Sequence, residues 1–348
     1  MRRLKLVIFV CVLAGMSIVI SCATSTPYSF NEKIAWLTNN LFGPSTKYKE
    51  LTPFIPETTT LNEITPKVTI AFLGDIMMIP GKRLTFSNDL KQFFSRADYL
   101  VGNFEGTITS LSRGLLGSKH SEQILTDLKA LFPPEKTILT NANNHTCDYP
   151  KQELDRSVQL QKQHGFIPIG LKQQPTVLLN NKINVASVTK WSNKPCPYLA
   201  EFDDSDSTYN KQAEFNLLAP HWGYEMQLYP NPEQINKSKS LLSRWDMIVG
   251  HHSHIPQVIT SYRVNNTNKL VAYSLGDFCT FARPDKYLYG IVVLAEIGPD
   301  VNGIWQVGKI EWRFSYVNHL DNKTIRVELT DGFKYSELPL KDFPDSDD

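Results

Sequence analysis

The chain has 348 residues, of which 41% are hydrophobic and 11% aromatic, which is enough to bury the core of one large domain or two small ones. Its formal net charge is +1, and the basic residues Arg2, Arg3 and Lys5 precede Cys22 with no acidic residue among them, so removing them takes the charge to −2. A chain with this charge has no electrostatic support for binding nucleic acid, and we expect no nucleic-acid partner.

A basic start and an apolar run from Leu6 to Ile20 open the sequence. The run has 15 residues, fewer than the roughly 20 that span a bilayer, so we predict a secretory signal over residues 1–21. The stretch "VISC", ending at Cys22, resembles a bacterial lipobox, in which the cysteine is lipidated. We therefore expect an exported lipoprotein of the cell envelope, held at the membrane by Cys22; the alternative is an ordinary cleaved signal with an incidental cysteine.

Residues 22–66 are interpreted as the lipid anchor and a linker. The segment 31–43 has the pattern of a short helix, and the Thr- and Pro-rich stretch 51–66 is typical of a connection between an anchor and a folded domain.

From Lys67 onward, continuous apolar runs typical of buried strands alternate with helical patterns. The helical patterns cover 121–132, 150–165 and 232–245, where Gly165 serves as a C-cap and Pro232 begins a first turn. This alternation predicts an α/β fold with a mostly parallel sheet. The carboxyl ends of the strands, where sites form in such sheets, carry these polar residues: Asp75, Asn103, Glu105, Asn144, His145, His221, His252, His254 and Asp277.

Each of these motifs alone has an ordinary structural explanation, such as a turn, a solvated loop or a core histidine. The stretch "VGHHSHIPQ" is more specific, because residues two apart in extended backbone face the same side. His252 and His254 are then expected to point together and His251 to point away. Six polar strand ends at one sheet edge predict a metal site.

Six motifs, "GDIMM", "NFEGT", "NNHTCDY", "HWGYE", "GHHSHIPQ" and "YSLGDF", together resemble the bacterial capsule-synthesis CapA family, which is associated with poly-γ-glutamate surface polymer. That family is in turn similar to calcineurin-like metallophosphoesterases. The resemblance covers residues 67–297 and implies a metallophosphatase-like α/β/β/α sandwich.

The resemblance implies a site that holds one or two divalent ions, Mn, Fe or Zn, and the donors contain no thiolate. Its implied metal ligands are Asp75, Glu105, Asn144, His221, His252 and His254. His145 matches the histidine that protonates a leaving oxygen, and Asp148 is placed to orient that imidazole.

Departures from the phosphoesterase pattern weaken one metal position. Met77 stands where those enzymes have a histidine, and a thioether is a poor ligand for such ions. Asp277 replaces an asparagine and is either an outer-shell partner or a new ligand; Asn103 is a second outer-shell candidate. The three cysteines after Cys22 allow at most one disulfide, and we interpret Cys147 and Cys279 as buried free thiols, with a bond between them left open.

Two function classes follow. The first is a metal-dependent hydrolase or transferase acting on a phosphoester or an anionic surface polymer; the second is a non-catalytic component that holds a polymer or the subunits of a membrane synthase. No Walker-type nucleotide loop occurs, so ATP-driven ligation would need a partner. Residues 298–348 are interpreted as a strand extension of the sheet with an acidic tail.

Overall fold

The structure is a computed structural model that describes residues 30–48, 55–114, 117–332, 334–335 and 338–339. The predicted signal over 1–21, the lipidation site Cys22 and the end of the acidic tail lie outside these residues. Within the described ranges, no helix combines the length and the apolar character needed to cross a membrane.

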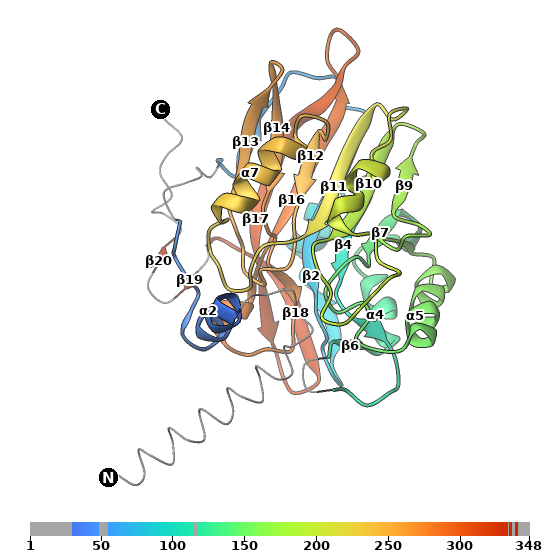
Figure 1. Cartoon of the computed structure of the whole chain (residues 1–348), viewed down its shortest axis with the longest axis vertical. Coiled ribbons are helices and arrows are strands. Elements are labelled where there is room, and N and C mark those ends of the chain that lie inside the picture. The colour runs from blue at the N-terminus through green and yellow to red at the C-terminus, as the bar shows by residue number, and fades with distance from the viewer. Residues whose placement is uncertain (1–29, 49–54, 115–116, 333, 336–337, 340–348) are drawn as a thin grey trace.

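The larger of two main sheets contains ten strands within the described part of the chain (Figure 1). Its order is β3 (Arg83–Phe86), β18 (Thr324–Thr330), β17 (Trp305–His319), β16 (Tyr289–Pro299), β2 (Val68–Ile76), β4 (Tyr99–Phe104), β7 (Thr137–Thr140) and β8 (Ile167–Ile169). In addition, β1 (Thr58–Thr60) pairs with β17, and β15 (Asp277–Cys279) pairs with β2. The strands from β2 to β8 are parallel, as the alternating sequence pattern predicts.

The smaller sheet has six strands among the described residues, in the order β13 (Ile259–Val264), β14 (Thr267–Ala272), β12 (Met247–Val249), β11 (Phe215–His221), β10 (Ile183–Thr189) and β9 (Thr176–Leu179). Strands β10, β11, β12 and β14 are parallel, and the outer strands are antiparallel. Short pairs outside both sheets are β5 (Thr107–Ile108) with β6 (Lys119–His120) and β19 (Lys334–Tyr335) with β20 (Leu338–Pro339).

Helices flank both sheets. They are α2 (Phe30–Phe42), α3 (Asn88–Phe94), α4 (Gln123–Leu128), α5 (Lys151–Gln163), α6 (Ser205–Thr208) and α7 (Pro232–Leu241), with 3₁₀ turns at Pro134–Lys136, Phe202–Asp204 and Asp285–Tyr287. Helix α3 contacts β18 and α5 contacts β8, whereas α7 covers the smaller sheet. This arrangement agrees with the predicted α/β/β/α class.

The two sheets share one hydrophobic core, which explains why their strands read as continuous apolar runs. In β2 every residue except Thr69 is buried, because the strand has neighbours on both sides and layers on both faces. The C-terminal strands β17 and β18 lie in the same sheet as β2, and β1, within the stretch interpreted as a linker, pairs with β17.

Candidate metal centre

The carboxyl ends of strands from both sheets meet at one place and bring the predicted site residues together. Asp75 lies near the end of β2, Glu105 follows β4, and His221 ends β11. Asn103 lies in β4 itself, and Asp277 begins β15. The other residues lie in the segments that follow β7 and β12: Asn144, His145 and Asp148 after β7, and His252 and His254 after β12. Contacts among these side chains join the two sheets where their strand ends meet.

Glu105 is at the centre of the site and is fully buried. Its Oε2 accepts a hydrogen bond from Asn103 Nδ2 at 3.0 Å, but its Oε1 has no hydrogen-bond partner. Oε1 lies 3.6 Å from His254 Nε2, 3.8 Å from His221 Nε2 and 4.0 Å from His145 Nε2. These separations are long for hydrogen bonds, but two ligands that each bind one ion at about 2.1 Å lie roughly 3 to 4 Å apart.

Three overlapping sets of side chains could hold an ion, and within each set the ligand atoms lie within 4.8 Å of one another. The sets are Glu105 with His252 and His254, Asp75 with His254 and Asp277, and Asp75 with Glu105 and His221. Oxygen and imidazole donors of this kind suit a divalent cation of the first transition row. The orphaned Glu105 oxygen and this donor set together fit a metal ion.

Burial and mutual charge interactions shift the pKa values of the ionisable groups in the site. Burial raises the pKa of Glu105 well above its usual value and raises the pKa of Asp277 to about 7. Burial also lowers the pKa of His221 well below normal and the pKa of His252 to about 3. Burial alone would lower the pKa of His254 too, but the charges of Glu105 and Asp277 outweigh it and hold this pKa well above normal. A bound cation would compensate the buried carboxylates directly.

His145 and Asp148 form a pair at the wall of the site. Asp148 Oδ2 lies 2.6 Å from His145 Nδ1 and also accepts a hydrogen bond from the Ser118 backbone N–H at 2.8 Å. The contact with Asp148 holds the ring with Nε2 4.0 Å from Glu105 Oε1.

The residues after β10 complete this wall, and sequence reasoning missed them. Asn193 Nδ2 lies 3.3 Å from His145 Nδ1, and its backbone N–H donates to Asn144 O at 2.9 Å. Trp191 Nε1 donates to His252 Nε2 at 3.2 Å. Because β10 is parallel to β11, the rule that sites form at the carboxyl ends of strands would have indicated these residues as well.

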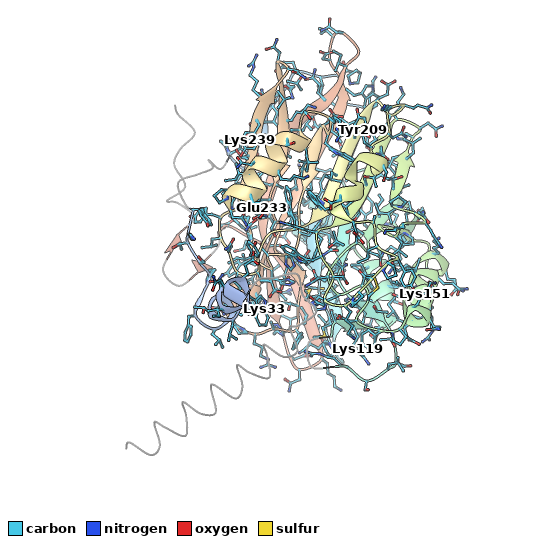
Figure 2. The ribbon with its side chains drawn as sticks, in the orientation of Figure 1. Lys33, Lys119, Lys151, Tyr209, Glu233 and Lys239 are labelled. Carbon is cyan, nitrogen blue, oxygen red and sulfur yellow. A yellow bond between two sulfur atoms is a disulfide. The ribbon has the colours of Figure 1, made fainter. Side chains whose placement is uncertain are left out.

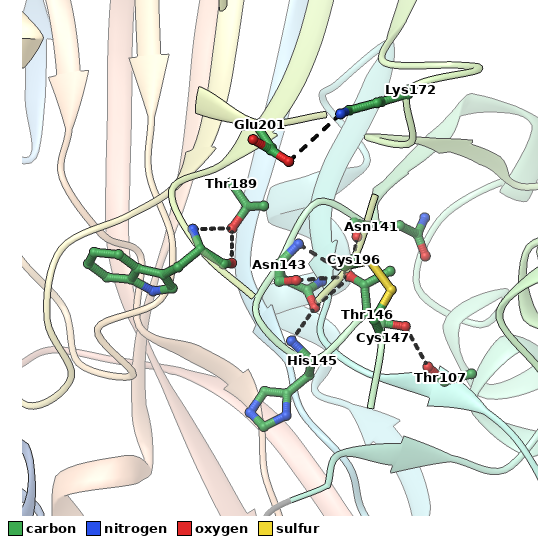
Figure 3. Close-up of a disulfide and its surroundings, with 11 residues drawn as sticks. Thr107, Asn141, Asn143, His145, Thr146, Cys147, Lys172, Thr189, Cys196 and Glu201 are labelled. Carbon is green, nitrogen blue, oxygen red and sulfur yellow. Dashed lines mark hydrogen bonds and ion pairs between the residues drawn. A yellow bond between two sulfur atoms is a disulfide. The ribbon is translucent and has the colours of Figure 1, made fainter. Parts of the chain in front are cut away.

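A disulfide joins Cys147, two residues after His145, to Cys196 in the segment after β10, with the Cα atoms 5.7 Å apart (Figure 3). The interpretation of Cys147 as a free thiol was therefore wrong, whereas Cys279 is free and buried as expected. The pairing depends on how two loops from different sheets, with the cysteines 49 residues apart in sequence, meet beside the site, and cysteine spacing does not reveal this.

His251 also belongs to the site, contrary to the expectation that it points away. Its Nδ1 lies 3.0 Å from Asp75 Oδ1, and the residue is 1% exposed. The alternation rule failed because the backbone is not extended here: φ is +100° at His252 and +54° at His254. Both rings still approach the carboxylates, as the metal sets above require.

Asp277 and Met77 lie where the sequence departs from the phosphoesterase pattern. Asp277 Oδ1 lies 2.9 Å from His254 Nδ1, and β15 places Asp277 beside Asp75. The contact with His254 suits an outer-shell partner, and membership in one metal set suits a ligand. Met77 contributes to the wall of the adjoining cavity.

That cavity has a volume of about 830 Å³. His145, His254 and Asp277 line it on the side of the site, and Lys33 and Trp36 of α2 line another side. The cavity therefore adjoins His145 and two of the residues in the candidate metal sets, His254 and Asp277.

Comparisons with known proteins point to one family. Residues 69–189 and 199–281 match the family described as bacterial capsule synthesis protein PGA_cap. The chain is 28% identical over 241 residues to the PGA biosynthesis protein CapA of Bacillus subtilis (strain 168), covering 60% of this chain and 62% of that protein. It is 25% identical over 254 residues to the capsule biosynthesis protein CapA of Bacillus anthracis, covering 61% of this chain and 59% of that protein. The chain thus spans about three fifths of the length of these relatives.

Solved structures give weaker matches. A hypothetical protein from Thermus thermophilus aligns with a TM-score of 0.43 and 14% identity over 71% of this chain and 98% of its own. A putative 5′-nucleotidase from Staphylococcus aureus aligns with a TM-score of 0.40 and 13% identity, over 70% of this chain and 54% of its own. The sequence evidence is the stronger, because the family model covers more than half of the chain and includes the candidate metal ligands. This protein belongs to the bacterial capsule synthesis PGA_cap family.

Proposed function

We propose that this chain is a surface-anchored protein of capsule or poly-γ-glutamate synthesis or processing, and that its site carries out metal-dependent hydrolysis or transfer. The observation that supports it best is the unpartnered Oε1 of buried Glu105, 4.0 Å from the imidazole of the His145–Asp148 pair. A metal-binding position and an oriented proton donor side by side suit chemistry more than they suit a scaffold.

The metal would be Mn, Fe or Zn, held by the predicted ligands Asp75, Glu105, Asn144, His221, His252 and His254. When bound, such an ion supplies Lewis acidity that polarises a phosphoryl or carbonyl oxygen. Asp277 would either orient His254 or complete the position that Met77 leaves short of a ligand.

The protein's own residues would bind and orient the substrate and move a proton. With Nδ1 held by Asp148, His145 presents Nε2 to the site and would protonate a leaving oxygen, a contribution of typically ~10² to 10⁴ in rate. Arg113 and Lys194 line the same cavity, and their charges suit an anionic polymer or a phosphoester.

We further propose that the chain is exported and tethered to the membrane through Cys22. The Cys147–Cys196 disulfide supports this location, because disulfides persist in oxidising compartments outside the cytosol. Subunits of a membrane synthase are the partners that such a location would favour.

A second candidate function is a non-catalytic, metal-stabilised component that holds a polymer or a synthase. Met77 favours it, because the phosphoesterase pattern has a histidine ligand at this position.

Two variants in a deletion strain separate these functions. His145→Ala should keep the fold and the bound metal but lose surface-polymer production or phosphodiesterase turnover, whereas His252→Ala should lose the metal as well. His164→Ala is the matched control, since His164 pairs with Glu122 at the surface, away from the site. Full complementation by His145→Ala, together with failure of His252→Ala, would show that the metal is structural and the enzymatic proposal is wrong.

A further inference from the structure

Helix α2 exposes large apolar side chains and none of its charged residues to solvent. Its exposed residues are all uncharged: Asn31, Ile34, Ala35, Thr38, Leu41 and Phe42. Leu41 is 60% exposed and Phe42 is 83% exposed. The charged residues of the helix, Glu32 and Lys33, are half-buried instead. A helix between a protein core and water normally shows its charges to solvent and its apolar stripe to the core.

The inner face of α2 is fixed by specific contacts, so a loosely placed helix does not explain the exposed apolar side chains. The Tyr224 hydroxyl donates to Glu32, and the Tyr287 hydroxyl donates to Asn40 Oδ1 at 2.6 Å. Asn40 Nδ2 donates in turn to Glu225 Oε2 at 3.3 Å. Each of these contacts ties the helix to the segments beside the metal centre.

The same inner face forms part of the wall of the site cavity. Lys33, Trp36 and Asn40, which are three and four residues apart and so share one side of the helix, line the cavity. Figure 2 labels Lys33 on α2, in the lower left part of the view. Ile34 and Leu41 lie about 100° around the helix from this stripe, and Phe42 lies farther round.

Chain length limits how far α2 can lie from the proposed lipid anchor. Eight peptide units join Cys22 to Phe30, and an extended chain covers at most about 3.6 Å per residue, so the start of the helix lies within about 29 Å of the lipidated residue. Lys47, which is exposed just beyond the helix, adds a positive charge suited to anionic headgroups.

We propose that the outer face of α2 lies in the interface of the lipid bilayer, so that one helix contacts the membrane on one side and the site cavity on the other. This inference rests on the proposed anchoring through Cys22. The cavity is then held against the membrane, and its substrate is a chain or headgroup presented at the membrane surface and not a free polymer in the medium. Apolar exposed faces of this kind are what interfacial helices bury among lipids.

Depth-dependent fluorescence quenching tests this in the full-length lipidated protein on vesicles that contain phosphatidylglycerol. A fluorophore on Phe42→Cys is compared with the same fluorophore on Val301→Cys, which is 98% exposed in the turn between β16 and β17, at the end of the molecule opposite α2 in Figure 1. Labelling is selective, because Cys147 and Cys196 are paired and Cys279 is buried. Lipids that carry a quencher should reduce emission at position 42 several-fold more than at position 301.

The outcomes separate the two proposals. If the protein floats with the vesicles but both probes are quenched equally, the membrane-facing helix is wrong and the anchor stands. If the protein does not float, the anchor is wrong and the inference fails with it. If the probe at position 42 is shielded from water but not quenched by the lipid, the outer face of α2 binds another protein molecule instead of the bilayer. That result also overturns the inference. Leu41→Glu should reduce quenching at position 42 and leave the metal content unchanged; unchanged quenching would count against the proposal.

Discussion

Single residues of the metal centre make the metal-free protein sensitive to pH. Glu105, His254 and Asp277 each have a raised pKa in the folded state, so folding binds protons at these groups and the stability they contribute is lost as pH rises. His221 and His252 have lowered pKa values, so they destabilise the folded state at acidic pH and this cost disappears as the pH rises. The cost is gone once the pH has passed the ordinary histidine value of 6.5. Above pH 6.5, therefore, the folded state only loses stability, through the raised pKa values.

We therefore predict that the metal-free protein unfolds at progressively lower temperature between about pH 7 and 8.5. Added Mn or Zn should largely remove this dependence, because the ion binds the deprotonated ligands and stabilises the folded state by mass action. Thermal unfolding at several pH values, with and without chelator, measures both effects. A metal-free protein whose unfolding temperature rises over this range would contradict the assignment of the buried charges.

Single residues of the site could be predicted from the sequence where they follow a strand pattern: Asp75, Glu105 and His221 each stand at the carboxyl end of a strand. His251 could not be placed in the same way. Its position depends on the positive φ of His252 and His254, and the alternation rule assumes extended backbone. The pairing of Asp277 with both Asp75 and His254 likewise depends on how β15 crosses beside β2.

At the scale of elements, the disulfide ties the segment after β7 to the segment after β10. Removing it with Cys147→Ser and Cys196→Ser together should lower stability by about 4 kcal/mol, the loop-entropy value for a separation of 49 residues. Chemical denaturation measures this loss. The same double variant should have reduced polymer production or turnover, because Asn193 and the His145–Asp148 pair lie on the two tethered segments.

Reductant provides the control. It should weaken the wild type toward the level of the double variant and leave the double variant itself unchanged. Equal stability of the oxidised wild type and the double variant would contradict a structural role for this bond.

Sequence patterns predicted some elements better than others. Helix α7 begins at Pro232 as expected, and a capping box between Asn231 and Gln234 explains why its start is so clearly marked. Helix α4 covers only Gln123–Leu128, half of its predicted pattern, and the chain continues in turns to Phe132. Local pattern identifies an element, whereas packing determines where it ends.

For the whole molecule, the main prediction concerns attachment to the membrane. Cells grown with a labelled fatty acid should transfer the label to the wild type and not to Cys22→Ser, since the thiol of this residue is the predicted acceptor. The variant should also appear in the culture medium or as an uncleaved precursor. Equal labelling of both proteins would rule out lipidation at Cys22.

The joining of the two sheets by one site has a consequence for biogenesis. The His252 backbone N–H donates to Asp75 Oδ2 although the two residues are 177 positions apart, so the complete set of candidate ligands forms only after most of the chain has been made. An ion that uses the full set would bind only once both sheets have formed, and contacts this distant form slowly. If the chain crosses the membrane unfolded, the ion it receives is selected from the metals available outside the cell, and not from those in the cytosol.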